Sequence, residues 1–291
     1  MKGIILAGGT GSRLFPTTLA ISKHLLPVYD KPCIYYPIST LMLADVREIL
    51  IILNQRDLLS YKLLLGDGKK FGIDITFAIQ NKPNGIAEAL ILAEDFLCGE
   101  DLILTLGDNI FYGDELSSLL ITAKKYPKIG QIFTYHVADP TRFGVVTVNK
   151  QGAPTSIEEK PKMPKSNLAV TGLYFYRNEV IKLAKNLEPS IRDELEITDI
   201  NNQLLVNENL TVVNLGRGIG WFDIGTPTSL LEASQFIHTI QQRQGLLIAC
   251  LEEISFGRNW LSLEQLKEQS EKQSSTSYGE YINSLISRES G

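Results

Sequence analysis

The sequence has little cysteine, little histidine and no long apolar run, and each shortage excludes a class of protein. Its three cysteines, Cys33, Cys98 and Cys250, form an odd and widely spaced set that matches neither a disulfide framework nor a metal motif, so we expect reduced thiols. The three histidines are equally scattered. After Met1-Lys2, only four apolar residues precede Gly8, too few for a signal peptide, and no apolar run approaches the roughly 18 residues of a membrane span. We therefore expect a soluble, cytoplasmic protein.

An excess of basic charge is also missing. The formal net charge is -5 at pH 7, so the composition predicts no binding surface for a nucleic acid polymer. A polyanionic nucleotide would have to be bound by a few local cations. Apolar residues make up 44% of the chain, which is enough for a sizeable core in one large α/β domain or in two domains.

Short apolar runs alternate with helical stretches in the first third of the chain. We predict strands at 4–7, 48–53, 73–79 and 102–106, and helices at 37–44, 58–65 and 86–97. This alternation predicts an α/β fold with a doubly wound, Rossmann-like, mostly parallel sheet flanked by helices. In such sheets, ligands bind at the carboxyl ends of the strands.

The pattern changes after residue 130. Strand-like runs broken by prolines between 131 and 176 predict a small antiparallel region for a second substrate. A helix at 196–206, a strand at 210–215 and a turn-rich segment at 220–225 follow, then a helix capped by Thr226 with Pro227 at its first position. Amphipathic helices are expected at 263–267 and 278–286. We divide the chain into a catalytic domain at 1–243, with a nucleotide part at about 1–130 and a sugar part at about 131–226, and a helical extension at 244–291.

The first predicted strand leads into the loop Gly8-Gly9-Thr10-Gly11-Ser12-Arg13. Glycines let backbone N–H groups approach an anion, and Arg13 and Lys23 can add positive charge against phosphate oxygens. The loop lacks the P-loop string, and Leu14 stands where a dinucleotide fingerprint needs its third glycine. From these residues alone, the loop is either a phosphate cradle or a tight connection between a strand and a helix.

Two carboxylates stand out further along the chain. Asp108 follows the strand at 102–106, and Asp223 lies in the sequence WFDIG. Two such acids brought together can hold Mg²⁺, with phosphate oxygens and waters completing its shell. A lone aspartate at a strand end is more often a turn residue or a helix cap, so the residues alone leave both interpretations open.

Taken as a whole, GGTGSRLFPTTLAISKHLLPVYDKPCIYYP resembles the signature of the sugar-1-phosphate nucleotidylyltransferases, and most closely the long form of the branch that transfers a thymidylyl group to glucose 1-phosphate. The resemblance recurs to about Trp260. It implies that the phosphate of glucose 1-phosphate attacks dTTP in line, releasing pyrophosphate and forming dTDP-glucose for deoxysugars such as dTDP-rhamnose. A UTP-using uridylyltransferase is one alternative, and a catalytically inactive nucleotide-sugar sensor is an alternative of another class.

The resemblance also implies roles for matching residues. Those implied in catalysis are Arg13, Lys23, Asp108 and Lys160. Those implied in nucleotide binding are Gly8, Gly9, Thr10, Gly11, Ser12, Arg13, Lys23, His24, Gln80, Gly85 and Asp108. Those implied on the sugar-phosphate side are Asn109, Gly144, Glu159, Lys160, Val170, Tyr174 and Arg192. Asp108 and Asp223 match the ligands of the Mg²⁺ cofactor. By composition alone, the turn with Glu159 and Lys160 would be solvated surface.

The run GLLIACLEEISFGRNW resembles the extension of long-form members of this family. It implies a homotetramer and a regulatory site for the end product between subunits, with Arg217, Cys250, Glu253 and Arg258 as candidates. The alternative is an extension that merely packs on the catalytic domain. His24 departs from the family pattern, because glutamine is common at its position.

Overall fold

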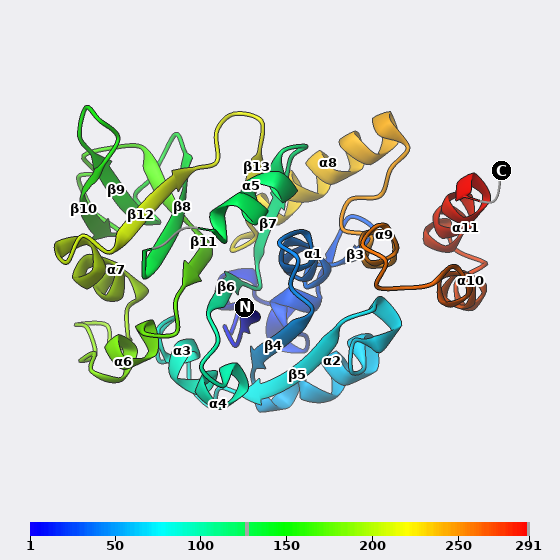
Figure 1. Ribbon diagram of the computed structural model, residues 1–291, viewed down its shortest axis with the longest axis horizontal. Coiled ribbons are helices and arrows are strands. Elements are labelled where there is room, and N and C mark those ends of the chain that lie inside the picture. Colours follow the sequence, from blue (N-terminus) through cyan, green and yellow to red (C-terminus); the bar gives the residue numbers. More distant parts are fainter. Residues whose placement is uncertain (126–127, 290–291) are drawn as a thin grey trace.

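The computed structural model describes residues 1–125 and 128–289 of the chain. Within them, nine strands form one mixed sheet in the order β10-β9-β11-β6-β1-β4-β5, with β8 paired to β11 and β12 paired to β8 (Figure 1). The strands are β1 Lys2–Ala7, β4 Glu48–Leu53, β5 Asp74–Ile79, β6 Leu102–Leu106, β8 Gly130–His136, β9 Gly144–Val148, β10 Pro154–Glu159, β11 Leu168–Tyr176 and β12 Leu210–Asn214. The predicted α/β class, with a parallel core and a smaller antiparallel region, is confirmed.

The four strands β1, β4, β5 and β6 run parallel and form one end of the sheet, with β5 at its edge. Their side chains alternate between two apolar cores: Ile5 of β1 belongs to one, and its neighbour Ile4 to the other. This alternation follows from the pleat, which sends successive side chains to opposite faces. Because both faces are covered by helices, β4 and β6 are nearly continuous apolar runs in the sequence, whereas the edge strand β5 alternates with polar residues.

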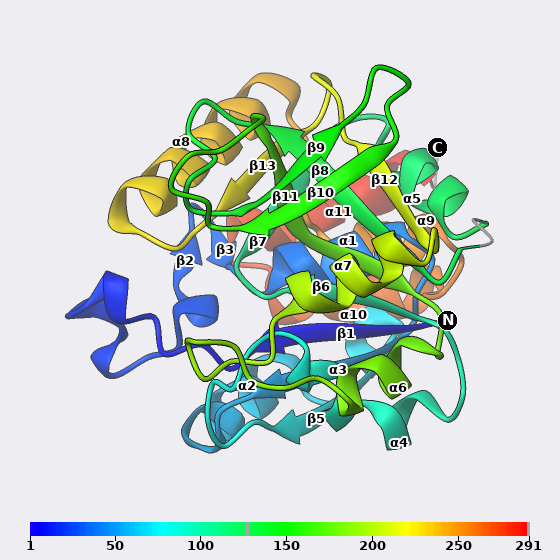
Figure 2. The ribbon, with the colours of Figure 1, turned by 90° about the vertical axis from the view of Figure 1, so that its left-hand side faces the viewer.

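Helices contribute to the core on each face. The helices α1 Tyr35–Leu43, α2 Leu58–Leu65 and α5 Leu116–Ala123 share one core with β1 and β4. The helices α3 Glu88–Leu92, α6 Val180–Lys185 and α7 Ile197–Val206 share the other. Figure 2, which looks onto the antiparallel end of the sheet, shows α3 and α6 together below β1 and α8 at the opposite margin.

Two local expectations were wrong. The segment 220–225, expected as a turn-rich approach to a helix, contains the strand β13 Gly220–Asp223, which pairs antiparallel with β7 Asn109–Tyr112. The single helix expected at 86–97 is interrupted at Ala93 and forms α3 and α4 Glu94–Leu97. A short hairpin of β2 Pro27–Val28 and β3 Lys31–Pro32 follows the glycine-rich loop segment.

The described chain after Thr226 contains helices and connecting segments. Helix α8 Pro227–Gln244 begins as predicted, with Thr226 and Ser229 forming a capping box and Pro227 in the first turn. The helices α9 Leu251–Gly257, α10 Leu263–Lys272 and α11 Ser277–Glu289 follow and contain the two predicted amphipathic stretches. Figure 1 shows α10 and α11 at the end of the molecule opposite the antiparallel strands. None of the helices described is both long and apolar enough to cross a membrane.

Candidate active site

The pairing of β7 with β13 brings together the two acids that the sequence singled out. Asp223 stands opposite Asn109 in the register, and the Ile224 N–H donates to the Asp108 carbonyl oxygen at 3.0 Å. Asp108 enters from the end of β6 and Asp223 from β13, strands that lie far apart in the sequence. Their juxtaposition therefore depends on a pairing that no local pattern predicts.

Both acids line a cavity of about 420 Å³ beside the sheet. Its wall also contains Arg13 from the glycine loop and residues from β9 to β11 and from the start of α7. The predicted site residues on this wall are Arg13, Asp108, Asn109, Gly144, Glu159, Lys160, Val170, Tyr174 and Asp223. The structure thus gathers residues from both predicted halves of the site around one cavity.

Asp108 is paired with a lysine inside the protein. Its carboxylate forms an ion pair with the Lys23 ammonium, and the Asn109 amide donates to its other oxygen at 2.9 Å. Burial alone would raise the pKa of Asp108, but Lys23, His24 and the hydrogen bonds together outweigh burial and hold the pKa well below its usual range. Asp108 is therefore ionised throughout the neutral range.

The carboxylate of Asp223 is paired with an arginine, and its pKa is raised rather than lowered. Burial and the nearby negative charge of Asp108 raise its pKa, while Arg142, at 2.9 Å, and Arg13 oppose the rise. The two carboxylates are therefore near enough to repel each other electrostatically. A divalent cation between them would relieve this repulsion.

The residues present fit a magnesium ion that shares its shell with a substrate. Among the described residues, no group of three or more His, Cys, Asp or Glu side chains gathers as a complete protein cage. Two carboxylates at the wall of an open cavity suit Mg²⁺, which keeps waters and substrate oxygens as its other ligands. The predicted ligands Asp108 and Asp223 match that donor set.

The glycine loop is held open and close to the acids. Gly11 has φ +66°, a left-handed conformation that other residues adopt with strain, and its carbonyl accepts from Thr18 Oγ1 at 2.7 Å. A Cβ on Gly9 would lie 3.5 Å from Cε of Lys23. The Arg13 guanidinium packs against Gly225, where an added Cβ would lie 2.7 Å from Nη2. Gly225 thus leaves room for Arg13, and Lys23 lies in van der Waals range of Gly9.

His24 lies buried beside Lys23 and Ser22. Its side chain is 1% exposed, with Nδ1 3.2 Å from Oγ of Ser22. Burial and the adjacent Lys23 lower its pKa to about 3, against the weaker pull of Asp108, so the ring is neutral. The ring packs beneath Gly107, and the predicted contact of His24 with a nucleotide stays a prediction.

The predicted base-recognition residues, Gln80 and Gly85, do not line the cavity. Gln80 is 4% exposed, and its Oε1 faces Gly8, where an added Cβ would lie 2.4 Å away. Gly85 has φ +105° and packs directly on the backbone of Leu195, whose carbonyl accepts from Ala87 N–H at 3.1 Å. The turn between β5 and α3 is therefore fixed to the segment that precedes α7.

On the other side of the cavity, Glu159 is the centre of a polar cluster. Its Oε2 accepts from Thr198 Oγ1 at 2.6 Å, and its Oε1 lies 3.4 Å from Nη2 of Arg192 and 3.3 Å from Nζ of Lys160. Arg192 itself stays outside the cavity wall and binds mainly Glu196, at 2.7 Å. Carboxylate and hydroxyl groups beside two cations suit a ligand that carries both hydroxyls and a phosphate.

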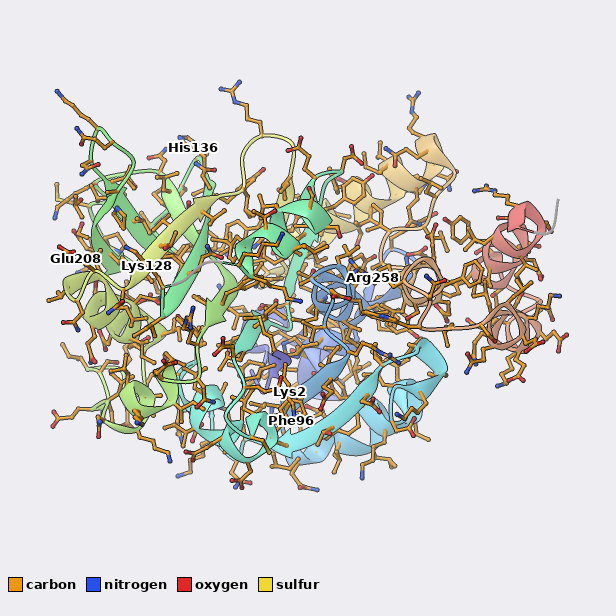
Figure 3. All side chains as sticks on the ribbon, viewed as in Figure 1. Lys2, Phe96, Lys128, His136, Glu208 and Arg258 are labelled. Carbon is orange, nitrogen blue, oxygen red and sulfur yellow. The ribbon has the colours of Figure 1, made fainter. Side chains whose placement is uncertain are left out.

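The four regulatory candidates do not form one cluster. Cys250 and Glu253 line a second cavity of about 200 Å³ between α1, β7 and α9. Arg258, labelled in Figure 3, lies at the end of α9 and donates to the Leu43 carbonyl at 2.7 Å, which ties α9 to α1. Arg217 is exposed in the loop between β12 and β13 and does not line that cavity.

Several residues of the site were missed by the sequence analysis. Arg142 pairs with Asp223, and the Trp221 indole donates to Asn109 Oδ1 at 2.6 Å. Glu88 accepts from Nε2 of Gln80 at 2.7 Å. Arg142 lies two residues before Gly144, a predicted site residue, and this proximity in the sequence was the available signal. The partner of Trp221 is distant in the sequence, whereas Gln80 lies only eight residues before Glu88.

Comparisons with known proteins place the chain among enzymes. The family model described as Nucleotidyl transferase matches residues 2–240. A glucose-1-phosphate thymidylyltransferase of Neisseria meningitidis is 51% identical over 288 residues, which cover 99% of this chain and 100% of that protein. An enzyme of the same name from Mycobacterium tuberculosis is 46% identical over 290 residues, with 99% and 100% coverage.

Solved structures agree with these sequence relatives. A crystal structure assigned to a glucose-1-phosphate thymidylyltransferase of Bacillus anthracis, in complex with a sucrose, matches with a TM-score of 0.75 and 43% identity. The match covers 81% of this chain and 94% of the chain in that crystal structure. A UDP-glucose pyrophosphorylase complexed with UDP-glucose matches with a TM-score of 0.73 but only 21% identity, covering 82% and 98% of the two chains, which shows a shared fold and no more.

Proposed function

This chain belongs to the nucleotidyl transferase family, among the glucose-1-phosphate thymidylyltransferases, and on that premise we propose that it transfers the thymidylyl group of dTTP to α-D-glucose 1-phosphate. The products are dTDP-glucose and pyrophosphate. The observation that carries the proposal is the single cavity that contains Asp108, Asp223 and Arg13 on one side and the Glu159 cluster on the other.

The reaction needs little proton transfer from the protein. The phosphate of glucose 1-phosphate is already largely ionised near neutral pH, so no general base is required to activate it. The barrier is mainly electrostatic, because two anions must approach and negative charge builds up on the leaving pyrophosphate. Fixed cations aimed at those oxygens are therefore the main contribution of the protein.

The proposed role of each side chain follows the family resemblance. Arg13 binds the β- and γ-phosphates and stabilises the leaving pyrophosphate, and Lys23, beside the glycine loop, meets the nucleotide phosphates. Asp108 and Asp223 are the residues that would hold Mg²⁺, which supplies positive charge to the phosphate oxygens when bound. Lys160 and Arg192 neutralise the sugar phosphate, and Glu159 accepts from sugar hydroxyls. Support comes from the gathering of these groups at one cavity and its margin.

The choice of base rests on the relatives and on Gln80. A glutamine amide oxygen can accept from the N3–H of thymine, but uracil presents the same N3–H. The thymidylyl branch is favoured because the relatives that are alike over nearly the whole chain bear that name. A catalytically inactive sensor is disfavoured, because it would have no need for the Arg13, Lys23, Asp108, Lys160 and Asp223 set.

The resemblance to the thymidylyl branch leads to three further proposals. We propose a homotetramer, product use in deoxysugar synthesis such as that of dTDP-rhamnose, and an end-product site that includes Cys250 and Glu253. The small cavity under α9 supports the last of these, because it lies apart from the catalytic cavity.

A panel of nucleotides tests the proposed activity. Pyrophosphate release would be measured with glucose 1-phosphate, Mg²⁺ and each of dTTP, UTP, dCTP and dATP. The highest kcat/KM is expected with dTTP. A preference for UTP would move the chain to the uridylyl alternative, and binding of dTDP-glucose without turnover of any nucleotide would favour the sensor.

A further inference from the structure

The side-chain amide of Gln80 is held between two unlike neighbours. Gln80 follows β5 and is 4% exposed. Its Nε2 donates to Oε2 of Glu88 at 2.7 Å, and its Oε1 lies over the backbone of Gly8, where a Cβ would meet it at 2.4 Å. One end of the amide therefore faces a carboxylate and the other end faces the glycine loop.

The carboxylate of Glu88 is itself fixed. Its Oε1 accepts from Asn84 Nδ2 at 2.8 Å. The backbone of the same turn is fixed to a distant segment, because the Leu195 N–H donates to the Asn84 carbonyl at 2.7 Å and Gly85 packs against Leu195 with no room for a side chain. Glu88 begins α3, so its position is set by both the turn and the helix.

These contacts decide which way the Gln80 amide points. A carboxylate offers only acceptors, so the NH₂ end of the amide must face Glu88. The reverse orientation would place the amide oxygen against a carboxylate oxygen and leave both without a donor, which is costly for a buried group. The oxygen end is therefore the end presented toward the glycine loop.

We propose that Glu88 is a positioning residue for base selection: it holds Gln80 so that Oε1 is presented as an acceptor to the N3–H of the pyrimidine. This inference rests on the proposed function and deepens it. Thymine and uracil carry a hydrogen at N3, whereas the N3 of neutral cytosine is a lone pair. An amide oxygen that cannot flip attracts the first two bases and repels the third.

The test compares two substitutions of nearly the same size. Glu88→Met removes the acceptor, and Glu88→Gln keeps one acceptor oxygen for Gln80. For each full-length variant, kcat and KM are measured with dTTP and with dCTP. With Glu88→Met, the KM for dTTP should rise about tenfold with a smaller change in kcat, and the preference for dTTP over dCTP should fall by a similar factor, which corresponds to about 1.4 kcal/mol. With Glu88→Gln, most of the preference should return.

An unchanged preference for dTTP over dCTP in a folded Glu88→Met enzyme would overturn the inference, as would a loss of kcat with KM and preference intact. If Glu88→Met does not fold, Asn84→Leu serves instead. It removes one donor to the Glu88 carboxylate, and its preference for dTTP should fall by a smaller factor, whereas no change would again count against the inference. A wild-type protein that forms no dTDP-glucose would refute the proposed function itself, which is a separate outcome.

Discussion

Asp108 and Asp223 differ in the cations that accompany them. Asp108 is paired with Lys23 inside the protein, and Asp223 is paired with Arg142 at the cavity wall. Each acid thus has its own counter-charge before any substrate binds. Loss of one carboxylate would leave a cation without its partner and remove a predicted magnesium ligand.

We expect Asp108→Asn to lower kcat by at least about 10³-fold, because the change removes one of two acids that would hold the ion. The fold should survive, since Asn109 and the strand pairing stay in place. Pyrophosphate release and thermal melting would be measured together. Asp95→Asn, an exposed change away from the cavity, is the matched control and should be near wild type. A fully active Asp108→Asn enzyme would contradict the metal assignment.

His24 makes stability depend on pH. Its folded pKa of about 3 lies below the unfolded value near 6.5, so acid protonates the unfolded chain first. The stability contributed by the neutral ring is complete above about pH 6.5 and is lost as the pH falls toward 3. At pH 5 the loss is about 2 kcal/mol.

His24→Gln should therefore lose about 2 kcal/mol less stability than wild type between pH 7 and pH 5. Urea unfolding at both pH values measures the difference. His136→Gln, at the exposed position labelled in Figure 3, should keep the acid sensitivity of wild type. Equal acid sensitivity in His24→Gln and wild type would show that His24 does not carry this effect.

At the level of single residues, the sequence predicted what local motifs encode. Asp108, Arg13 and Glu159 sit in recognisable strings, and the structure places all three on one cavity. Arg142 was missed because its partner Asp223 lies in a distant segment. An ion pair or hydrogen bond between distant segments leaves no pattern in either segment alone.

Among the elements, the parallel strands were the most predictable. β4 and β6 are continuous apolar runs because helices cover both of their faces. β13 was missed because it is four residues long, begins at a glycine and is stabilised by pairing with β7 from a distant part of the chain. The division of the chain into domains stays a prediction.

The turn between β5 and α3 depends on a glycine. Gly85→Ala should displace this turn, because the new Cβ would lie 2.3 Å from the Leu195 carbonyl oxygen at a φ of +105°. We expect the KM for dTTP to rise about tenfold, a factor that corresponds to about 1.4 kcal/mol, and the melting temperature to fall. Nucleotide kinetics and thermal melting measure both effects.

Gly99→Ala is the matched control for this change. Gly99 also has a positive φ, of +86°, but open space surrounds its missing Cβ. It should cost only about 1 kcal/mol of backbone strain and leave the KM for dTTP unchanged. If both variants raise the KM equally, strain rather than contact with Leu195 would explain the effect.

At the scale of the whole molecule, the C-terminal helices are attached through buried polar contacts. Tyr278 and Tyr281 of α11 donate to Glu252 and Glu253 of α9, at 2.5 and 2.8 Å. Glu252 is 1% exposed, and burial raises its pKa despite the Tyr278 hydrogen bond. The sequence predicted a helical extension, but this attachment depends on helix packing that periodicity does not show.

Light scattering on the purified protein tests the predicted assembly. A homotetramer should have a mass of four times the 32.4 kDa chain at micromolar concentration. A monomer that converts dTTP at full rate would show that catalysis does not depend on subunit contacts. It would also remove the basis for an end-product site between subunits.

The central claim is that one cavity, with two acids and a few fixed cations, lets a sugar phosphate displace pyrophosphate from dTTP. Phosphorus NMR of the wild-type protein with dTTP, glucose 1-phosphate and Mg²⁺ tests it most directly. The account predicts that dTDP-glucose and pyrophosphate form in equal amounts, and that neither forms when the metal is chelated. Release of inorganic phosphate without dTDP-glucose, or unchanged dTTP, would contradict it.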